Sequence, residues 1–148
     1  MEKKVMPTTW FLGFLFLIII LHFLIDEKII ISFPYNQMGW IPVIAGIVLN
    51  LWTDNLFKKY ETTVKPYLNP SQLISNGPFR ISRNPMYFGM LLILLGTSVL
   101  LKSIALIIIP LIYFIVMQIF YIRKEEQSML REFGTEYMKY KKQVRPWI

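Results

Sequence analysis

The chain has 148 residues, of which 55% are hydrophobic, and a mean hydropathy of +0.47. Apolar runs too long for the core of a small soluble domain indicate an integral membrane protein, and the length allows one domain. The sequence has no cysteine and a single histidine, His22, which excludes disulfides, thiolate metal sites and histidine-cluster metal sites. The net charge of +7 lies in segments that flank the apolar runs, which is typical of membrane topology and not of nucleic-acid binding.

Four apolar runs follow one another along the chain. They cover about residues 9–25, 39–57, 85–101 and 103–122. Each is near the ~20 residues that a helix needs to cross the hydrocarbon core. Because only Lys102–Ser103 interrupts the last two runs, they predict an antiparallel helical hairpin with a tight turn.

The segment that follows the fourth run, residues 123–142, is rich in charge and carries apolar residues at helical spacing. Its basic face suits an anionic cytoplasmic leaflet, so we expect an amphipathic helix there. The predicted fold is therefore an all-α integral membrane helical bundle of four transmembrane helices with a C-terminal cytoplasmic amphipathic helix. The apolar positions of that last helix are Leu130, Phe133, Tyr137 and Tyr140.

The distribution of basic residues predicts the orientation in the cell membrane. Fourteen of the sixteen Lys and Arg residues lie in the N-terminus, in the segment between the second and third runs, or in the tail, and only Lys28 and Lys102 lie in the other connections. The positive-inside rule then places both termini in the cytoplasm. Two polar blocks, residues 76–89 and 125–140, flank the last hairpin, so we expect them to meet on the cytoplasmic face and build one site.

The first block contains residues that are typical of the start of a helix. Asn84-Pro85 is a turn former, and proline is well placed in the first turn of the third span. A helix N-terminus offers free N–H groups to a carboxylate, and Arg80 and Arg83 add positive charge there. A plain positive-inside loop explains the same pattern, so both interpretations stay open.

The second block opens with the acidic pair Glu125-Glu126 at the end of the fourth span. One interpretation is a solvated face that pairs with the neighbouring cations Arg123, Lys124 or Arg131. The other is that one carboxylate binds a cation such as an ammonium group in a partly buried pocket, where the pairing is stronger than at an open surface.

The two blocks together resemble a known family. Residues 77–89, GPFRISRNPMYFG, resemble the Gly-Pro-aromatic-Arg-x-x-Arg-His-Pro-x-Tyr-x-Gly signature of the membrane-embedded isoprenylcysteine carboxyl methyltransferase and phospholipid methyltransferase superfamily. Residues 125–140 resemble its Glu-Glu-x-x-x-Leu-x-x-Phe-Gly-x-x-Tyr-x-x-Tyr tail. The resemblance covers about residues 71–148. Asn84 departs from the pattern, because it replaces the usual histidine.

This resemblance implies a methyltransferase that binds S-adenosyl-L-methionine at the cytoplasmic ends of the last two spans. It assigns Glu125 to the methionine portion of the cofactor and places Tyr121 where the isoprenylcysteine enzymes have a substrate-binding arginine, with Arg123 two residues on. Tyr121 and Arg123 are therefore the candidate catalytic residues, and no metal is expected. The candidate cofactor-binding residues are Gln72, Leu73, Ile74, Phe79, Asn84, Pro85, Met86, Tyr87 and Glu125.

The predicted function is an integral membrane S-adenosylmethionine-dependent methyltransferase that acts on a lipid or lipid-linked acceptor. The whole chain, residues 1–148, is expected to form one domain, with two N-terminal spans in residues 1–60 and the cofactor-binding hairpin and tail in residues 71–148. Two alternatives stay open: a nicotinamide-dependent membrane reductase of related fold, and a non-catalytic small membrane protein or transporter. A transporter is expected to carry polar residues in mid-span, and the last two runs carry few.

Overall fold

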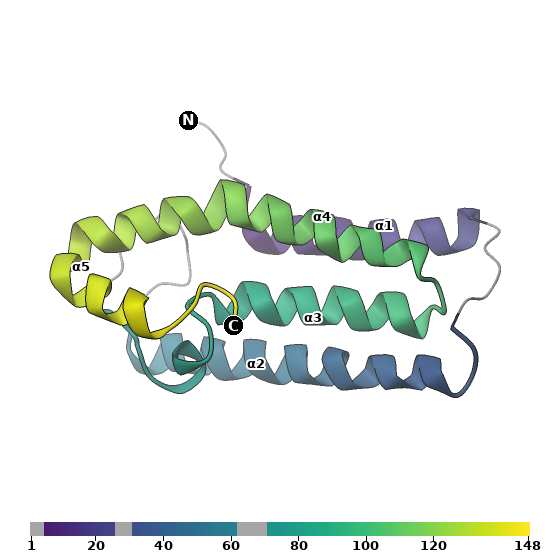
Figure 1. Cartoon of the computed structure of the whole chain (residues 1–148), viewed down its shortest axis with the longest axis horizontal. Coiled ribbons are helices and arrows are strands. Elements are labelled where there is room, and N and C mark those ends of the chain that lie inside the picture. The colour runs from purple at the N-terminus through teal and green to yellow at the C-terminus, as the bar shows by residue number, and fades with distance from the viewer. Residues whose placement is uncertain (1–4, 26–30, 62–70) are drawn as a thin grey trace.

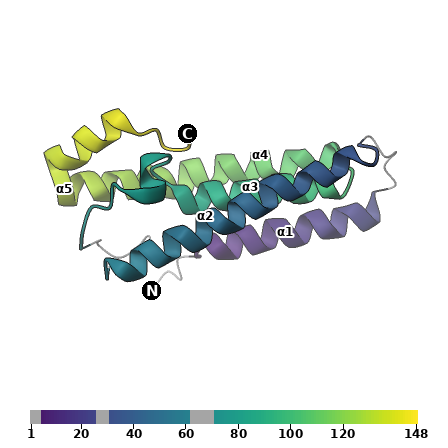
Figure 2. The ribbon, with the colours of Figure 1, turned by 90° about the horizontal axis from the view of Figure 1, so that it is seen from below.

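The computed structural model describes residues 5–25, 31–61 and 71–148, in which every regular element is helical. The long helices lie side by side along a common axis (Figures 1 and 2). They are α1 (Pro7–Leu24), α2 (Trp40–Lys59), α3 (Pro85–Leu100), α4 (Ile108–Met117) and α5 (Arg123–Gln143), and a π-helical turn, η4 (Gln118–Ile122), joins α4 to α5. Short 3-10 helices precede three of them: η1 (Tyr35–Gly39), η2 (Gly77–Arg80) and η3 (Ala105–Ile107).

Three helices among the described residues are long and apolar enough to cross a membrane. They are Pro7–Leu24, Tyr35–Lys59 and the continuous helix Ala105–Gln143, whose apolar part ends at Ile122. Helix α3 has 16 residues, which at 1.5 Å per residue is ~24 Å, against a hydrocarbon core of about 30 Å. The four predicted helical runs are therefore confirmed as helices, and the count of four complete crossings stays a prediction.

Glycines bring α2 and α3 together in the most extensive helix contact of the bundle. Gly39 faces Gly96 near one end, and Gly46 faces Gly89 further along. A Cβ atom added to Gly96 would lie 2.5 Å from the carbonyl oxygen of Gly39 and 2.6 Å from Cγ2 of Val43. Small residues are what allow two backbones to approach this closely.

The predicted tight turn between α3 and α4 is confirmed. Lys102 adopts a φ of +63° and its N–H donates to the carbonyl of Val99 at 3.0 Å. The hydroxyl of Ser103 accepts the N–H of Leu106 at 3.2 Å and so starts the next helix. This turn lies at one end of the bundle, whereas η2, α5 and the C-terminus lie toward the other (Figure 1).

Helix α5 is bent, which the amphipathic pattern does not predict. Gly134 has φ +47° and ψ −118°, so the last two turns fold back along the bundle (Figure 1). Tyr137 and Tyr140 are buried, whereas Leu130 is 44% exposed. Leu130 lies before the bend and the two tyrosines lie after it, so the apolar positions of the expected amphipathic helix do not all pack against the bundle.

Candidate functional site

The two polar blocks pack against each other at one end of the bundle. Ile74 and Phe79, from the segment before α3, form a buried cluster with Tyr137 and Tyr140 of α5. The hydroxyl of Tyr140 donates to the carbonyl oxygen of Phe79 at 2.7 Å, and the ring of Phe57 meets that of Phe79 edge-on, with centroids 5.6 Å apart. The predicted meeting of the two blocks is therefore confirmed, and their use as one binding site stays a prediction.

Tyr87 and Glu125 make the central polar contact between the blocks. The hydroxyl of Tyr87, in the first turn of α3, donates to Oε1 of Glu125, near the start of α5. Glu125 lies beyond the apolar part of its helix, and burial raises the pKa of its carboxyl to about 7, with the Tyr87 hydrogen bond opposing this. Among the described residues no cation forms an ion pair with it. Glu125 is thus a half-buried residue whose carboxylate is largely desolvated and has no ion-pair partner in the described ranges.

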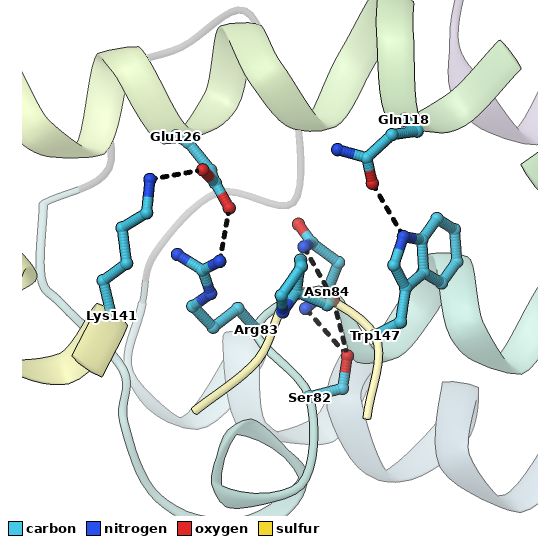
Figure 3. Close-up of polar contacts among 8 residues, drawn as sticks. Ser82, Arg83, Asn84, Gln118, Glu126, Lys141 and Trp147 are labelled. Carbon is cyan, nitrogen blue, oxygen red and sulfur yellow. Dashed lines mark hydrogen bonds and ion pairs between the residues drawn. The ribbon is translucent and has the colours of Figure 1, made fainter. Parts of the chain in front are cut away.

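The neighbouring Glu126 has two cationic partners. Its Oε1 lies 2.8 Å from Nη2 of Arg83 and its Oε2 lies 2.8 Å from Nζ of Lys141 (Figure 3). This ion pair network joins the loop before α3 to both halves of bent α5. Burial and the charge of Glu126 raise the pKa of the nearby Tyr137 phenol to about 12, with Arg83 opposing.

Glu126 therefore does not lie on a solvated face that pairs with its sequence neighbours, which was one of the two interpretations of the acidic pair. Its partners come from distant parts of the chain, and neither is one of the adjacent cations Arg123, Lys124 and Arg131.

The C-terminal residues form a strap across the first block. The hydroxyl of Ser82 and Nδ2 of Asn84 both donate to the carbonyl oxygen of Pro146, at 3.1 Å and 2.9 Å. Trp147 donates from Nε1 to Oε1 of Gln118 at 2.7 Å (Figure 3). Asn84, which stands at the family's histidine position, therefore anchors the tail through its amide nitrogen.

The two candidate catalytic residues lie in different surroundings. Tyr121 is buried, its ring is tilted against that of Tyr87 with centroids 6.4 Å apart, and its hydroxyl donates to the carbonyl oxygen of Val5 at 2.6 Å. Arg123 is exposed. The structure thus brings Tyr121 beside the Tyr87–Glu125 pair and leaves Arg123 on the surface.

The candidate cofactor-binding residues differ in their exposure to solvent. Ile74, Phe79, Pro85 and Tyr87 are buried, whereas Gln72 is exposed. Leu73, Asn84, Met86 and Glu125 are half-buried. No group of three or more His, Cys, Asp or Glu residues that could hold a metal ion occurs in the described ranges.

Sequence reasoning missed the residues that fasten the strap. Gln118 carries a signal, because it is one of few polar residues in an apolar run, and such residues are typically functional. It also opens the π-helical turn η4, a feature that is frequent at functional sites and that changes the helix register just before Glu125. Trp147 reads as an interfacial tryptophan in the sequence, and its partner Gln118 is 29 residues away.

Comparisons with known proteins identify the family of this chain. The sequence model of the phospholipid methyltransferase family matches residues 35–136, from η1 into the bent part of α5. An uncharacterized protein of Haemophilus influenzae is 36% identical over 63 residues, which are 43% of this chain and the whole of that protein. No solved structure matches the chain. The family model covers α2, α3, α4, Tyr87 and Glu125. The chain therefore belongs to the phospholipid methyltransferase family and is an integral membrane protein of the methyltransferase kind.

Proposed function

We propose that this protein transfers a methyl group from S-adenosyl-L-methionine to a lipid acceptor, most simply the amine of a phospholipid headgroup. The observation that carries the proposal is the Tyr87–Glu125 contact, which unites the two blocks around a largely desolvated carboxylate with no ion-pair partner among the described residues. An ammonium group is the natural ligand of such a carboxylate, since a charge-assisted hydrogen bond is about twice as strong as a neutral one. The amino-acid end of S-adenosylmethionine carries that ammonium group.

The remaining candidate residues then have distinct tasks. S-adenosylmethionine, when bound, supplies an electrophilic methyl group. Glu125 holds its ammonium group, and Tyr87 holds Glu125 in place. We assign further cofactor contacts to Leu73, Ile74 and Phe79, which pack in one cluster on α5, to the exposed Gln72, and to Asn84, Pro85 and Met86 at the start of α3. The contribution of the protein is alignment of donor and acceptor and exclusion of water, so no covalent enzyme intermediate is needed.

The acceptor side favours an amine over a carboxylate. Tyr121 occupies the position at which isoprenylcysteine enzymes carry an arginine, and its hydroxyl is bonded to Val5. Arg123 is exposed on the surface of α5, so it does not supply a buried cation there. A protonated amine would be repelled by a cation at this position, whereas a carboxylate would need one. The family description as phospholipid methyltransferase supports the same acceptor class.

We further propose that residues 71–148 hold the cofactor, that the helices within residues 1–60 support them, and that both termini face the cytoplasm. The acceptor then enters sideways from the bilayer and the soluble cofactor enters from the cytoplasm.

The orientation has a direct test. Reporter fusions at Lys102 should report the outer side, and fusions at Ile148 the cytoplasm, because fourteen of sixteen basic residues belong to the cytoplasmic segments. The turn that contains Lys102 lies at the end of the bundle opposite the bent end of α5 (Figure 1). A cytoplasmic signal from Lys102 would contradict the orientation of the α3–α4 hairpin.

The activity is tested by methyl transfer from labelled S-adenosylmethionine in lipid nanodiscs. We expect labelling of an amine-headgroup phospholipid and little labelling of a farnesylated cysteine analogue. In Tyr121→Arg, transfer to the cysteine analogue should rise relative to the lipid, because the new cation can pair with its carboxylate.

Calorimetric titration of the same protein separates the rival functions. Binding of S-adenosylmethionine without binding of NADPH is the expected result, and the reverse would identify a reductase. Binding of neither would leave a non-catalytic membrane protein. Robust turnover of the farnesylated analogue by the wild-type protein would instead assign a carboxylate acceptor.

A further inference from the structure

The C-terminal strap returns Trp147 to the apolar part of the bundle. Its indole ring packs on the ring of Phe114 with centroids 4.6 Å apart, and its Nε1–H donates to Oε1 of Gln118 at 2.7 Å (Figure 3). Both partners precede Ile122, at which the apolar part of the helix Ala105–Gln143 ends. The indole therefore lies at the depth of the membrane boundary, beside a polar group that belongs to a membrane span.

This contact lies on an open flank of the α3–α4 hairpin. Helix α1 covers one side of α3 and α4, and the strap lies on the side that faces away from α1 (Figures 1 and 2). Trp147 packs there against the core cluster that contains Tyr87 and Tyr121. A group that took the place of Trp147 on Gln118 would therefore contact the same cluster as these two tyrosines.

The amide of Gln118 needs a hydrogen-bond partner in this position. Gln118 is half-buried, and it is the only amide side chain in residues 105–122. Little water is available to a polar group at membrane depth, so its partner must come from the protein or from a lipid. The partner in this structure is Trp147, which belongs to residues 144–148 beyond the end of α5, where the chain is not helical. Few contacts therefore have to break for another donor to replace the indole.

The geometry around Gln118 defines the ligand that suits it. Oε1 accepts an N–H, which an amine headgroup can donate, whereas phosphate and ester oxygens are acceptors and cannot bond to this oxygen. Leu111 and Ile115 lie seven and three residues before Gln118, so they share its side of the helix, and both are exposed. A ligand with an N–H donor above an apolar chain fits this arrangement.

We propose that Gln118 binds the amine of the lipid acceptor through Oε1, and that Trp147 occupies this position when no lipid amine is bound. The inference rests on the proposed function, since it identifies a contact of the proposed acceptor. The acyl chains of the lipid then extend along Leu111 and Ile115. A fully methylated headgroup has no N–H left to donate, so Gln118 releases it and Trp147 returns. Gln118 thereby distinguishes an acceptor from its fully methylated form.

The binding test follows Trp147 by fluorine NMR. The protein is labelled with fluorotryptophan in phosphatidylcholine nanodiscs, and the signal of Trp147 is assigned by its loss in Trp147→Phe. Adding phosphatidylethanolamine, whose amine donates N–H, should move this signal in the wild type and leave it unmoved in Gln118→Leu. The signal of Trp40, which starts α2 at the other end of the bundle, should not respond and controls for changes of the bilayer (Figure 1).

Methyl transfer provides a second measurement on the same variants. Trp147→Phe keeps an aromatic ring for Phe114 and removes the competing N–H, so the KM for phosphatidylethanolamine should fall roughly two- to tenfold. Gln118→Leu should raise this KM on the order of tenfold, and Gln118→Glu, which keeps an acceptor oxygen, should restore it. Affinity for S-adenosylmethionine should stay within about twofold in all three variants.

A double variant shows whether the two residues act through one hydrogen bond. In the Gln118→Leu background, Trp147→Phe should give no further fall in KM, because the oxygen for which the lipid and the indole compete is gone. Trp40→Phe is the matched control for loss of an exposed indole and should leave KM unchanged.

The outcomes separate this inference from the proposed function. Methylation of the lipid without a response of the Trp147 signal would overturn the role of Gln118 and leave the methyltransferase proposal intact. An equal fall in KM with and without Gln118 would also overturn it, because the strap would then act only by covering the flank. A large loss of affinity for S-adenosylmethionine in Gln118→Leu would do the same. A response of Trp147 without methylation of any lipid would overturn the proposed function and retain Gln118 as a site for a lipid amine.

Discussion

Glu125→Gln should weaken binding of S-adenosylmethionine by roughly 1.5–3 kcal/mol, the usual contribution of a charged hydrogen bond, or about 10- to 150-fold in Kd. The neutral amide keeps the size of the side chain and can still contact Tyr87, so the change isolates the charge. Calorimetry on purified protein measures the effect. Glu126→Gln is the matched control and should do less, because Glu126 is engaged with Arg83 and Lys141.

The same residue makes binding depend on pH. Because the pKa of Glu125 is raised to about 7, the ligand-free protein holds a proton there at pH 5.5 that must leave before an ammonium group can pair. Affinity should therefore rise on the order of tenfold between pH 5.5 and pH 7 in the wild type and stay flat in Glu125→Gln. A parallel pH dependence in the variant would assign the proton to another group.

Stability shows whether the Glu125→Gln variant is folded. A carboxyl whose folded-state pKa lies above its unfolded value contributes stability that is present below pH 4.5 and is lost as the pH rises through about 7. The ligand-free variant should therefore be at least as stable as the wild type above pH 7. A large loss of stability there would mean that Glu125 is needed for folding, and its binding data would then carry no information on the cofactor.

Gly96→Ala should destabilise the protein by roughly 1–3 kcal/mol, the usual cost of overpacking a tight interior. The added methyl group would lie 2.5 Å from the Gly39 carbonyl oxygen and 2.9 Å from the Val43 backbone nitrogen, so α2 and α3 must move apart. Thermal unfolding in detergent measures the change.

Gly13→Ala is the matched control for Gly96→Ala. Gly13 also lies in the interior of a helix, α1, but a Cβ atom there has no other heavy atom within 4 Å. Replacement by alanine should be neutral or stabilising by up to about 1 kcal/mol, because alanine favours the helix. Equal destabilisation by both changes would contradict the view that Gly96 acts through the α2–α3 contact.

Local sequence signals predicted the helices well. Long apolar runs give the same helical preference in almost any surroundings, and Asn84-Pro85 begins α3 at the expected residue. The ion pair between Asp54 and Lys58, at 2.6 Å, is of the same kind, because residues four apart on a helix share a face wherever the helix lies. The apolar runs, the helix start and this ion pair all depend only on residues that are close together in the sequence.

The bend at Gly134 could not be predicted from periodicity. Glycine is tolerated within helices and is also suited to a positive φ, so the sequence allows a straight α5 and a bent one. Contacts made after the bend decide between them: Tyr140 donates to Phe79, and Lys141 reaches back to Glu126. These contacts join residues that are far apart in the sequence.

The sequence by itself determined the membrane character, the helical hairpin and the family, because hydropathy and a linear motif need no tertiary contact to be read. It also placed Tyr87 and Glu125 among the candidates. Only the tertiary structure decided which carboxylate lacks a cation, since Glu126 takes both Arg83 and Lys141 and Glu125 receives a neutral hydroxyl. Burial and charge pairing depend on which distant side chains the fold brings together, and that information is absent from the local pattern.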